Sequence, residues 1–171
     1  MLFRSERTLI EKAYFTLFYG GTGLASKYMD SVDDFQTDLK GWDTMNRSSN
    51  HCDWEGIQCA AHFGLAGTAN GVTPSTIVGF TINGFSLEGT LPNDMYQLSH
   101  LRKLDLHGNK IRGSIPGSWG NLRHLQWLNL QSNRLTGNIP PTFELLTNIK
   151  FLCLGENSLV GSISEKLVLG W

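Results

Sequence analysis

The chain has 171 residues, which is long enough for one domain or one repeat array to bury a core. It carries 14 Lys and Arg against 15 Asp and Glu, and this balance excludes a general electrostatic attraction to nucleic acid or to anionic membranes. Three cysteines are few for a fold built on disulfides, and no apolar run approaches the roughly 20 residues that a membrane-spanning helix needs.

The first segment predicts an amphipathic helix. The apolar residues that recur at helical spacing and share one face are Ile10, Ala13, Tyr14, Leu17 and Phe18. Gly20 and Gly21 would end such a helix. Charged residues between Arg4 and Arg7 interrupt any apolar stretch at the amino terminus, so the sequence predicts no secretory signal peptide there.

Residues 46–76 carry three local signals. Asn46 opens an N-glycosylation sequon, Asn-Arg-Ser. The stretch "HCDWEGIQC", residues 51–59, holds two cysteines seven positions apart, which suits a disulfide, a pair of zinc ligands or thiols kept for chemistry. Residues 60–76, "AAHFGLAGTANGVTPST", are small and rich in glycine, and they predict a loop.

The second half of the chain repeats every 24 residues. The frame L-x-x-L-x-L-x-x-N-x-L-x-G-x-I-P starts at Leu101, Leu125 and Ile149. A further copy starts 24 residues earlier, at Ile77, with Phe85 in the place of the asparagine. The four copies are residues 77–100, 101–124, 125–148 and 149–171.

Each position of the frame has a physical interpretation. The leucines are too closely spaced for a helical stripe and predict one short strand per rung. The asparagines fall where the chain must turn, and a column of side-chain amides can satisfy backbone groups that the bend would leave unpaired. The glycines permit a tight backbone, and the prolines prevent the preceding segment from continuing as a helix. These residues are Asn109, Asn133 and Asn157, then Gly113, Gly137 and Gly161, then Pro116 and Pro140.

The four copies resemble the leucine-rich repeat family, in the 24-residue plant-type subclass whose mark is the G-x-I-P half of the repeat. The resemblance implies an α/β fold, a solenoid with a short curved parallel sheet on the concave face and irregular or short helical segments on the convex face. It also implies a helical N-terminal cap over residues 1–59, a linker loop over 60–76 and four repeats over 77–171.

The resemblance extends to the two cysteines. The cap in this family ends in C-x-W-x-G-[VI]-x-C, which is matched by Cys52, Trp54, Gly56, Ile57 and Cys59. It therefore implies a disulfide between Cys52 and Cys59 that holds a strand against the first rung. A zinc site that adds His51 and His62 is the alternative, although structural zinc sites usually space their cysteines two to four residues apart. No recognisable motif supplies a general base for a catalytic thiol.

The strand residues between the leucines are expected to point away from the core and to form columns on the concave face. Trp127 and Phe151 are neighbours in one column and are flanked by cations, which is the composition of interface hot spots. The candidate ligand-contacting residues are Arg102, Lys103, Asp105, His107, Gln126, Trp127, Asn129, Lys150 and Phe151. The alternative is an ordinary solvated sheet surface.

Other reactive side chains give weaker signals. His100 and His124 lie one repeat apart but lack a third ligand, so no metal site is expected there. Cys153 is predicted to be a free thiol on a concave strand. The sequence contains no recognisable motif for catalysis or for a cofactor, and it therefore predicts neither an enzyme activity nor a bound cofactor.

These features together predict a protein or peptide recognition module, the N-terminal part of a receptor-like ectodomain or a secreted repeat protein. The expected partner is a protein or peptide ligand, with a co-receptor as one form of it, and not nucleic acid or membrane. The expected location is extracellular or at the cell surface. Two alternatives remain: an intracellular, cytoplasmic scaffold with reduced cysteines, and the non-catalytic repeat part of a larger enzyme such as a receptor kinase.

Overall fold

The computed structural model describes residues 10, 13, 50–65 and 72–166. Short elements follow one another along the chain, with one strand of the concave sheet and one short 3₁₀ helix in each full rung. The strands of the concave sheet are β1 (Ile57–Cys59), β2 (Ile77–Thr81), β3 (Lys103–Asp105), β5 (Trp127–Asn129) and β7 (Phe151–Cys153). Those of the second sheet are β4 (Arg112–Gly113), β6 (Arg134–Asn138) and β8 (Ser158–Val160). The 3₁₀ helices are η1 (His51–Asp53), η2 (Ala60–Phe63), η3 (Asn93–Gln97), η4 (Gly117–Asn121) and η5 (Pro141–Leu145).

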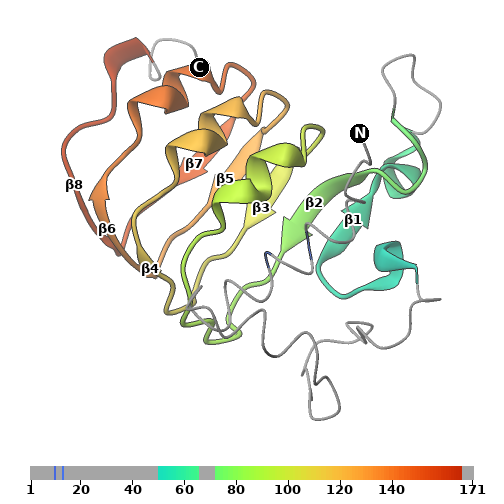
Figure 1. Ribbon diagram of the computed structural model, residues 1–171, viewed down its shortest axis with the longest axis horizontal. Coiled ribbons are helices and arrows are strands. Elements are labelled where there is room, and N and C mark those ends of the chain that lie inside the picture. The colour runs from blue at the N-terminus through green and yellow to red at the C-terminus, as the bar shows by residue number, and fades with distance from the viewer. Residues whose placement is uncertain (1–9, 11–12, 14–49, 66–71, 167–171) are drawn as a thin grey trace.

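The repeat strands form a parallel sheet, as the sequence predicts. The strand order is β1-β2-β3-β5-β7, and every pair from β2 onward is parallel. The register joins Gly79 to Lys103, Lys103 to Trp127 and Trp127 to Phe151, so residues 24 apart in sequence are neighbours across strands. Figure 1 shows β2, β3, β5 and β7 side by side. The predicted strand in each rung is therefore confirmed for the concave sheet, whereas the strands β4, β6 and β8 of the second sheet are additional to the prediction.

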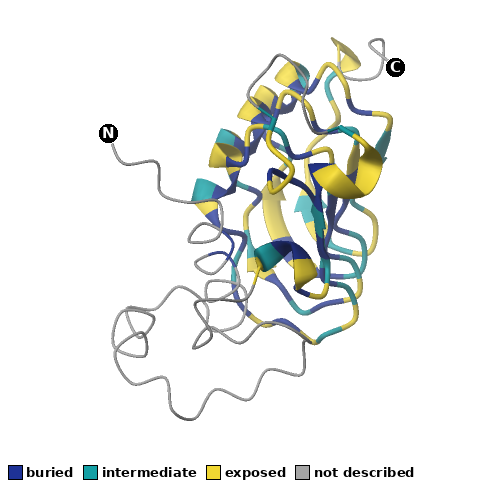
Figure 2. Cartoon of the chain, turned by 90° about the vertical axis from the view of Figure 1, so that its right-hand side faces the viewer, coloured by how far each residue is buried: buried dark blue, intermediate teal, exposed yellow. Residues whose placement is uncertain are grey.

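The short helices stack on the side of the array away from the concave sheet. Each of η3, η4 and η5 begins directly after a proline, namely Pro92, Pro116 or Pro140, which adopts extended backbone angles as the N-cap. A proline at this position disfavours a helical conformation of the residue before it, and it is compatible with a helix that begins directly after it. In Figure 2 these helices line one edge of the molecule and carry both exposed and buried residues.

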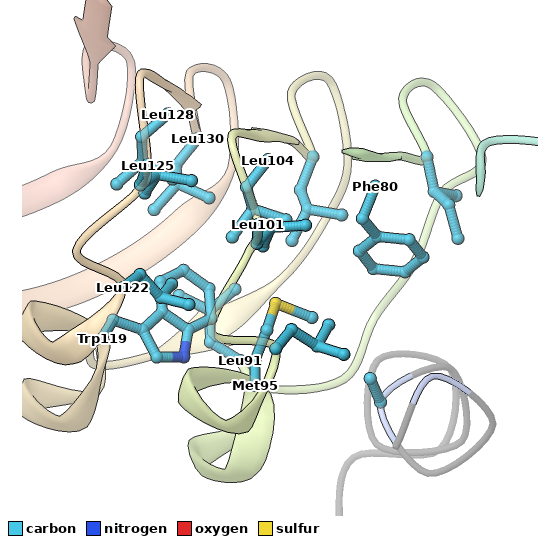
Figure 3. Packing of buried hydrophobic residues seen from close by; sticks show 14 of the residues in the cluster. Phe80, Leu91, Met95, Leu101, Leu104, Trp119, Leu122, Leu125, Leu128 and Leu130 are labelled. Carbon is cyan, nitrogen blue, oxygen red and sulfur yellow. The ribbon is translucent and has the colours of Figure 1, made fainter. Parts of the chain in front are cut away.

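The core runs as one continuous cluster through the rungs. The repeat leucines of the two central rungs are fully buried, and they are Leu101, Leu104, Leu106, Leu125, Leu128 and Leu130. Figure 3 shows leucines of these rungs facing Met95 and Trp119 across the interior. The indole Nε1 of Trp119 donates a hydrogen bond to the carbonyl of Pro92 at 3.0 Å, so this large buried ring also satisfies its polar atom. Trp119 and Phe143 are both core residues.

A ladder of asparagines ties each rung to the one before it. The amide nitrogen of Asn133 donates to the carbonyls of Leu106 in the preceding rung and Leu130 in its own, both at 3.0 Å. Its Oδ1 accepts from the backbone N–H of Ile111 at 3.1 Å. Asn109 and Asn157 make the corresponding bonds in their rungs. The predicted role of these amides at the bend is confirmed.

The described part of the cap closes the N-terminal end of the array. Strand β1 pairs antiparallel with β2, and a disulfide joins Cys52 to Cys59. Trp54, between the two cysteines, is buried in the core. Only Ile10 and Ala13 of the predicted cap helix are described; both are helical and buried in the same core. The remaining residues from 1 to 49, with the sequon at Asn46, lie outside the described residues, so the helical cap stays a prediction.

The segment expected to be a linker loop contains a helical turn. Residues Ala60–Phe63 form η2, which ends at Gly64 with a positive φ of 64°. The N–H of Gly64 is bonded to the carbonyls of Ala60 and Ala61, which closes the turn. Residues 66–71 lie outside the described residues. Within the described segments no helix is long and apolar enough to cross a membrane.

The ladder predicts a large destabilisation from one substitution. Asn133→Ala leaves the buried N–H of Ile111 without its partner, which costs about 1–3 kcal/mol. It also removes one of the two amide hydrogen bonds to each of the carbonyls of Leu106 and Leu130, which keep their bonds from Asn109 and Asn157. We expect a loss of about 2–4 kcal/mol in the free energy of unfolding, measured by urea denaturation followed by circular dichroism. The control is Asn121→Ala, an exposed asparagine in η4, which should change stability by less than about 0.5 kcal/mol. Equal effects of the two variants would contradict this role.

Two glycines with positive φ provide a second test. A Cβ on Gly56 (φ +83°) would lie 2.1 Å from the carbonyl oxygen of Thr81, which is backbone and cannot move aside without shifting β2. A Cβ on Gly64 (φ +64°) meets nothing within 4 Å. We expect Gly64→Ala to cost about 1–2 kcal/mol, the strain of the left-handed conformation alone, and Gly56→Ala to cost clearly more. Thermal unfolding of both variants measures the difference, and similar midpoints would refute the close contact.

Candidate functional site

The outward residues at the start of the strands form a row across the concave sheet. The N–H of Arg102 donates to Val78, that of Gln126 to Arg102 and that of Lys150 to Gln126, each at 2.8 Å. Adjacent strands in a sheet lie about 4.8 Å apart, so these four residues are evenly spaced across the face. Arg102 and Lys150 are exposed and Gln126 is half-buried.

The neighbouring column carries an aromatic stack. The rings of Trp127 and Phe151 lie 3.7 Å apart between centroids with an interplanar angle of 12°. The ammonium of Lys103 lies 5.7 Å from the centroid of the Trp127 ring, within range of a cation–π interaction. Trp127 is nevertheless 38% exposed, so the stack presents a free aromatic surface on the concave face. The in-register strands cause this contact, because they bring residues 24 apart into neighbouring positions.

A hollow of about 470 Å³ opens at the cap-proximal end of this face. It is lined by Gln58, Phe63, Leu65, Val78, Arg102, Lys103, Gln126, Trp127 and Lys150. Five of the nine candidate residues therefore meet at one site, and they are Arg102, Lys103, Gln126, Trp127 and Lys150. Phe151 contributes through its stack on Trp127.

The cap-side wall of the hollow was not among the residues that the sequence singled out. Phe63, the last residue of η2, is 56% exposed, and Leu65 follows it after the turn at Gly64. Gln58 reaches over from β1 because Gly79 opposite has no side chain; a Cβ there would lie 2.3 Å from the Gln58 Oε1. The available signal was Phe63 itself, the one aromatic residue of F/W/Y type in a segment rich in glycine and alanine.

Three other candidate residues lie further along the strands. Asp105 and Asn129 are buried, at 6% and 8% exposure, and accept hydrogen bonds from the backbone N–H groups of His107 and Gln131. The Asp105 Oδ1 also lies 2.6 Å from Nδ1 of His107, whose side chain is 44% exposed. Asp105 and Asn129 thus order the strand ends, and of this group His107 offers the accessible surface.

An acidic group lies in the bend between β7 and β8. The carboxylate of Glu156 accepts hydrogen bonds from the Ser132 hydroxyl at 2.6 Å and from the Gln131 amide at 2.9 Å. The bond from Ser132, followed by that from Gln131, lowers the pKa of this carboxyl below its usual value. This carboxylate lies outside the lining of the hollow, which includes three cations.

The disulfide decides between the interpretations of the cysteine pair. His51, Cys52 and Cys59 are the one group of three potential metal ligands among the described residues, with ligand atoms within 4.8 Å of one another. Both sulfurs are bonded to each other, however, so they are not thiolate ligands for zinc. The His62 Nδ1 faces the backbone N–H of Cys59 at 3.4 Å.

The remaining thiol and the histidine pair lie apart from the hollow's lining. Cys153 is free and half-buried, and its Sγ donates to the Gln131 Oε1 at 3.1 Å. The rings of His100 and His124 stack at 5.5 Å between centroids, and the described residues place no third metal ligand beside them. Neither feature adds to the lining of the hollow.

Comparison with known families identifies the repeat. Residues 89–135 match the family described as leucine rich repeat. A comparison with curated protein sequences gives no match. The match, the 24-residue register and the asparagine ladder agree on a leucine-rich repeat fold.

Similar solved structures come from plants. The ectodomain of the receptor kinase SOBIR1 from Arabidopsis thaliana is 26% identical, with a TM-score of 0.56 over 65% of this chain and 59% of its own. The ectodomain of the Arabidopsis receptor kinase HAESA, in complex with an IDA peptide hormone, is 26% identical, with a TM-score of 0.57 over 89% of this chain and 21% of its own. A plant ice-binding protein is 27% identical, with a TM-score of 0.61 over 73% of this chain and 37% of its own.

Thiol labelling tests the arrangement of the cysteines. Alkylation of the folded chain without reductant should modify one cysteine, Cys153, and after reduction and denaturation all three. Intact mass and peptide mapping measure this. The Cys52→Ser/Cys59→Ser variant should lose about 2 kcal/mol of stability, because the disulfide no longer restricts the unfolded chain, whereas Cys153→Ser serves as the control. Labelling of Cys52 or Cys59 before reduction would contradict the disulfide.

Proposed function

We propose that this leucine-rich repeat chain, similar in fold to plant receptor-kinase ectodomains, is a recognition module that binds a protein or peptide through its concave face. The observation that carries the proposal is the hollow of about 470 Å³, in which an exposed tryptophan and three cations converge. Interface hot spots are enriched in Trp, Tyr and Arg, and they lie in pockets from which a partner excludes water. Trp127 and Arg102 are residues of these types, and both line the hollow.

The rigidity of the face supports the same proposal. The ligand-facing residues start short strands whose backbone bonds run from rung to rung, and the asparagine ladder fixes the bend after each strand. A surface that is ordered before binding loses little conformational entropy when a ligand arrives. The HAESA ectodomain, which shares this fold, is in complex with a peptide hormone, and this supports a peptide as ligand for the present chain.

An extracellular location is part of the proposal. The disulfide between Cys52 and Cys59 is typical of oxidising compartments, and the similar receptor-kinase structures are ectodomains. The alternative of an intracellular scaffold predicts reduced cysteines at these two positions, which the bonded pair disfavours. The chain acts by binding and has no catalytic step in this proposal. A role as receptor ectodomain, as partner of a co-receptor or as secreted binding protein is compatible with the same face.

Selection of peptides tests the proposal. A random peptide library displayed on phage, selected against the folded chain, should yield binders whose affinity falls at least tenfold in Trp127→Ala, because the exposed ring and its stack with Phe151 are lost. The matched control is Tyr96→Ala, an aromatic residue with similar exposure, 37%, on the short helix η3. Affinities are measured by biolayer interferometry.

The same experiment can refute the function. A failure to select any binder for the folded chain would count against a recognition role for these residues. If the selected peptides bound Trp127→Ala with unchanged affinity but no longer bound Tyr96→Ala, the interface would lie on the helical side and not on the concave sheet. Circular dichroism of both variants checks that each is folded before the affinities are compared.

A further inference from the structure

We infer that the hollow selects one class of peptide: a segment in which an acidic side chain lies beside a bulky apolar side chain. This inference rests on the proposed function and specifies its ligand. It follows from two properties of the lining, the unpaired positive charge of Arg102, Lys103 and Lys150 and the apolar wall that the cap contributes.

The positive charge in the hollow has no counterpart in the described structure. Arg102, Lys103 and Lys150 all line it, and no aspartate or glutamate does. The ion pairs of the described residues involve other cations, namely His107, Lys110 and Lys166. Lys103 is directed to the Trp127 ring, which leaves its charge available beside an aromatic surface. Three cations at one site attract an anion and disfavour a cationic ligand by repulsion.

The geometry of the row matches a single anionic group. Arg102 and Lys150 stand on either side of Gln126, and two strand spacings place their backbones roughly 10 Å apart. Both side chains are long and exposed, so their charged ends can converge on one carboxylate above the Gln126 amide. An arginine can bind a carboxylate through two parallel hydrogen bonds, which adds directional preference to the charge.

The cap-side wall requires an apolar partner next to that anion. Phe63 is 56% exposed, and with Leu65, Val78 and Trp127 it makes the rest of the lining largely hydrocarbon and aromatic. Such a surface gains free energy only when a ligand covers it with apolar groups. In an extended peptide, side chains two residues apart point to the same side and lie about 7 Å apart. An acidic residue and an aromatic or leucine residue at that separation therefore fill both parts of the hollow.

Other polyanions fit this site less well. The chain as a whole carries a net charge of -1, so it offers no extended positive field for nucleic acid or a membrane surface. The cations are confined to the few residues of the hollow, and the apolar wall contributes nothing to a purely ionic ligand. A peptide that combines both kinds of side chain uses the complete lining, and this favours it over a simple polyanion.

A paired peptide array tests the inference. Acetylated and amidated hexapeptides carry Asp or Glu two positions from Trp, Phe or Leu, and each is matched by the same peptide with Asn or Gln. We expect acidic peptides to bind at least tenfold more tightly than their amide partners at low ionic strength, and the preference to shrink as salt is added. Binding of the full chain is measured by fluorescence polarisation.

Three variants assign the preference to the hollow. Arg102→Gln/Lys150→Gln should reduce the preference for acidic peptides to about twofold or less, because both exposed cations of the row are removed. The control Arg112→Gln/Arg134→Gln changes the net charge by the same amount. These two exposed arginines are register partners on β4 and β6, outside the hollow, so this variant should preserve the preference. Phe63→Ala should lower the affinity for acidic and amide peptides alike, by roughly tenfold, because it removes apolar contact.

The outcomes separate this inference from the proposed function. The inference would be overturned, and the recognition role left intact, if peptides bound without a preference for the acidic form and their binding was lost in Trp127→Ala. If the control Arg112→Gln/Arg134→Gln lost the preference equally, the cause would be the net charge of the whole chain, and this result would also overturn the inference. Tighter binding of heparin than of any peptide, unaffected by Phe63→Ala, would assign the site to simple polyanions. Absence of binding by every peptide would count against both proposals.

Discussion

The hydrogen bonds from rung to rung are the interaction on which the rest of this structure depends. Each strand is only a few residues long and cannot persist alone, because its polar backbone and its leucines need a neighbour on either side. The amides of Asn109, Asn133 and Asn157 extend this pairing into the bend, where a regular ladder ends and carbonyls would otherwise be buried without a donor. The result is a face whose side chains repeat at fixed spacing across neighbouring strands.

The fixed spacing explains how a sequence with little overall charge acquires a local site. Residues 24 apart become neighbours in space, so the aromatic pair of Trp127 and Phe151 and the row from Arg102 to Lys150 follow directly from the register. The cap then converts an open surface into a hollow. Its strand β1 pairs with β2, the disulfide closes the preceding turn, and η2 places Phe63 over the edge of the sheet. Recognition is thus shared between a regular array and the irregular segment that covers its end.

Burial separates the nine candidate residues in a way that the repeat pattern does not. Every strand position between leucines looks equivalent in the frame, yet Arg102, Trp127 and Lys150 are exposed while Asp105 and Asn129 are buried and bonded to the backbone. The difference arises because polar side chains near the strand ends reach the N–H groups of the following turn, whereas those at the strand starts have no such group nearby and extend into solvent.

The sequence by itself determined the repeat, the concave strand in each rung, the buried leucines and the asparagine ladder, because periodicity records which residues share an environment. It also placed Trp127 beside Phe151 and the flanking cations on one face. Only the tertiary structure decided that residues 60–65 turn back onto that face, where Phe63 and Leu65 form one wall of a hollow. It also decided that Asp105 and Asn129 are buried and accept hydrogen bonds from the backbone. These features come from contacts between segments without a shared period, and a single sequence carries no spacing rule for such contacts.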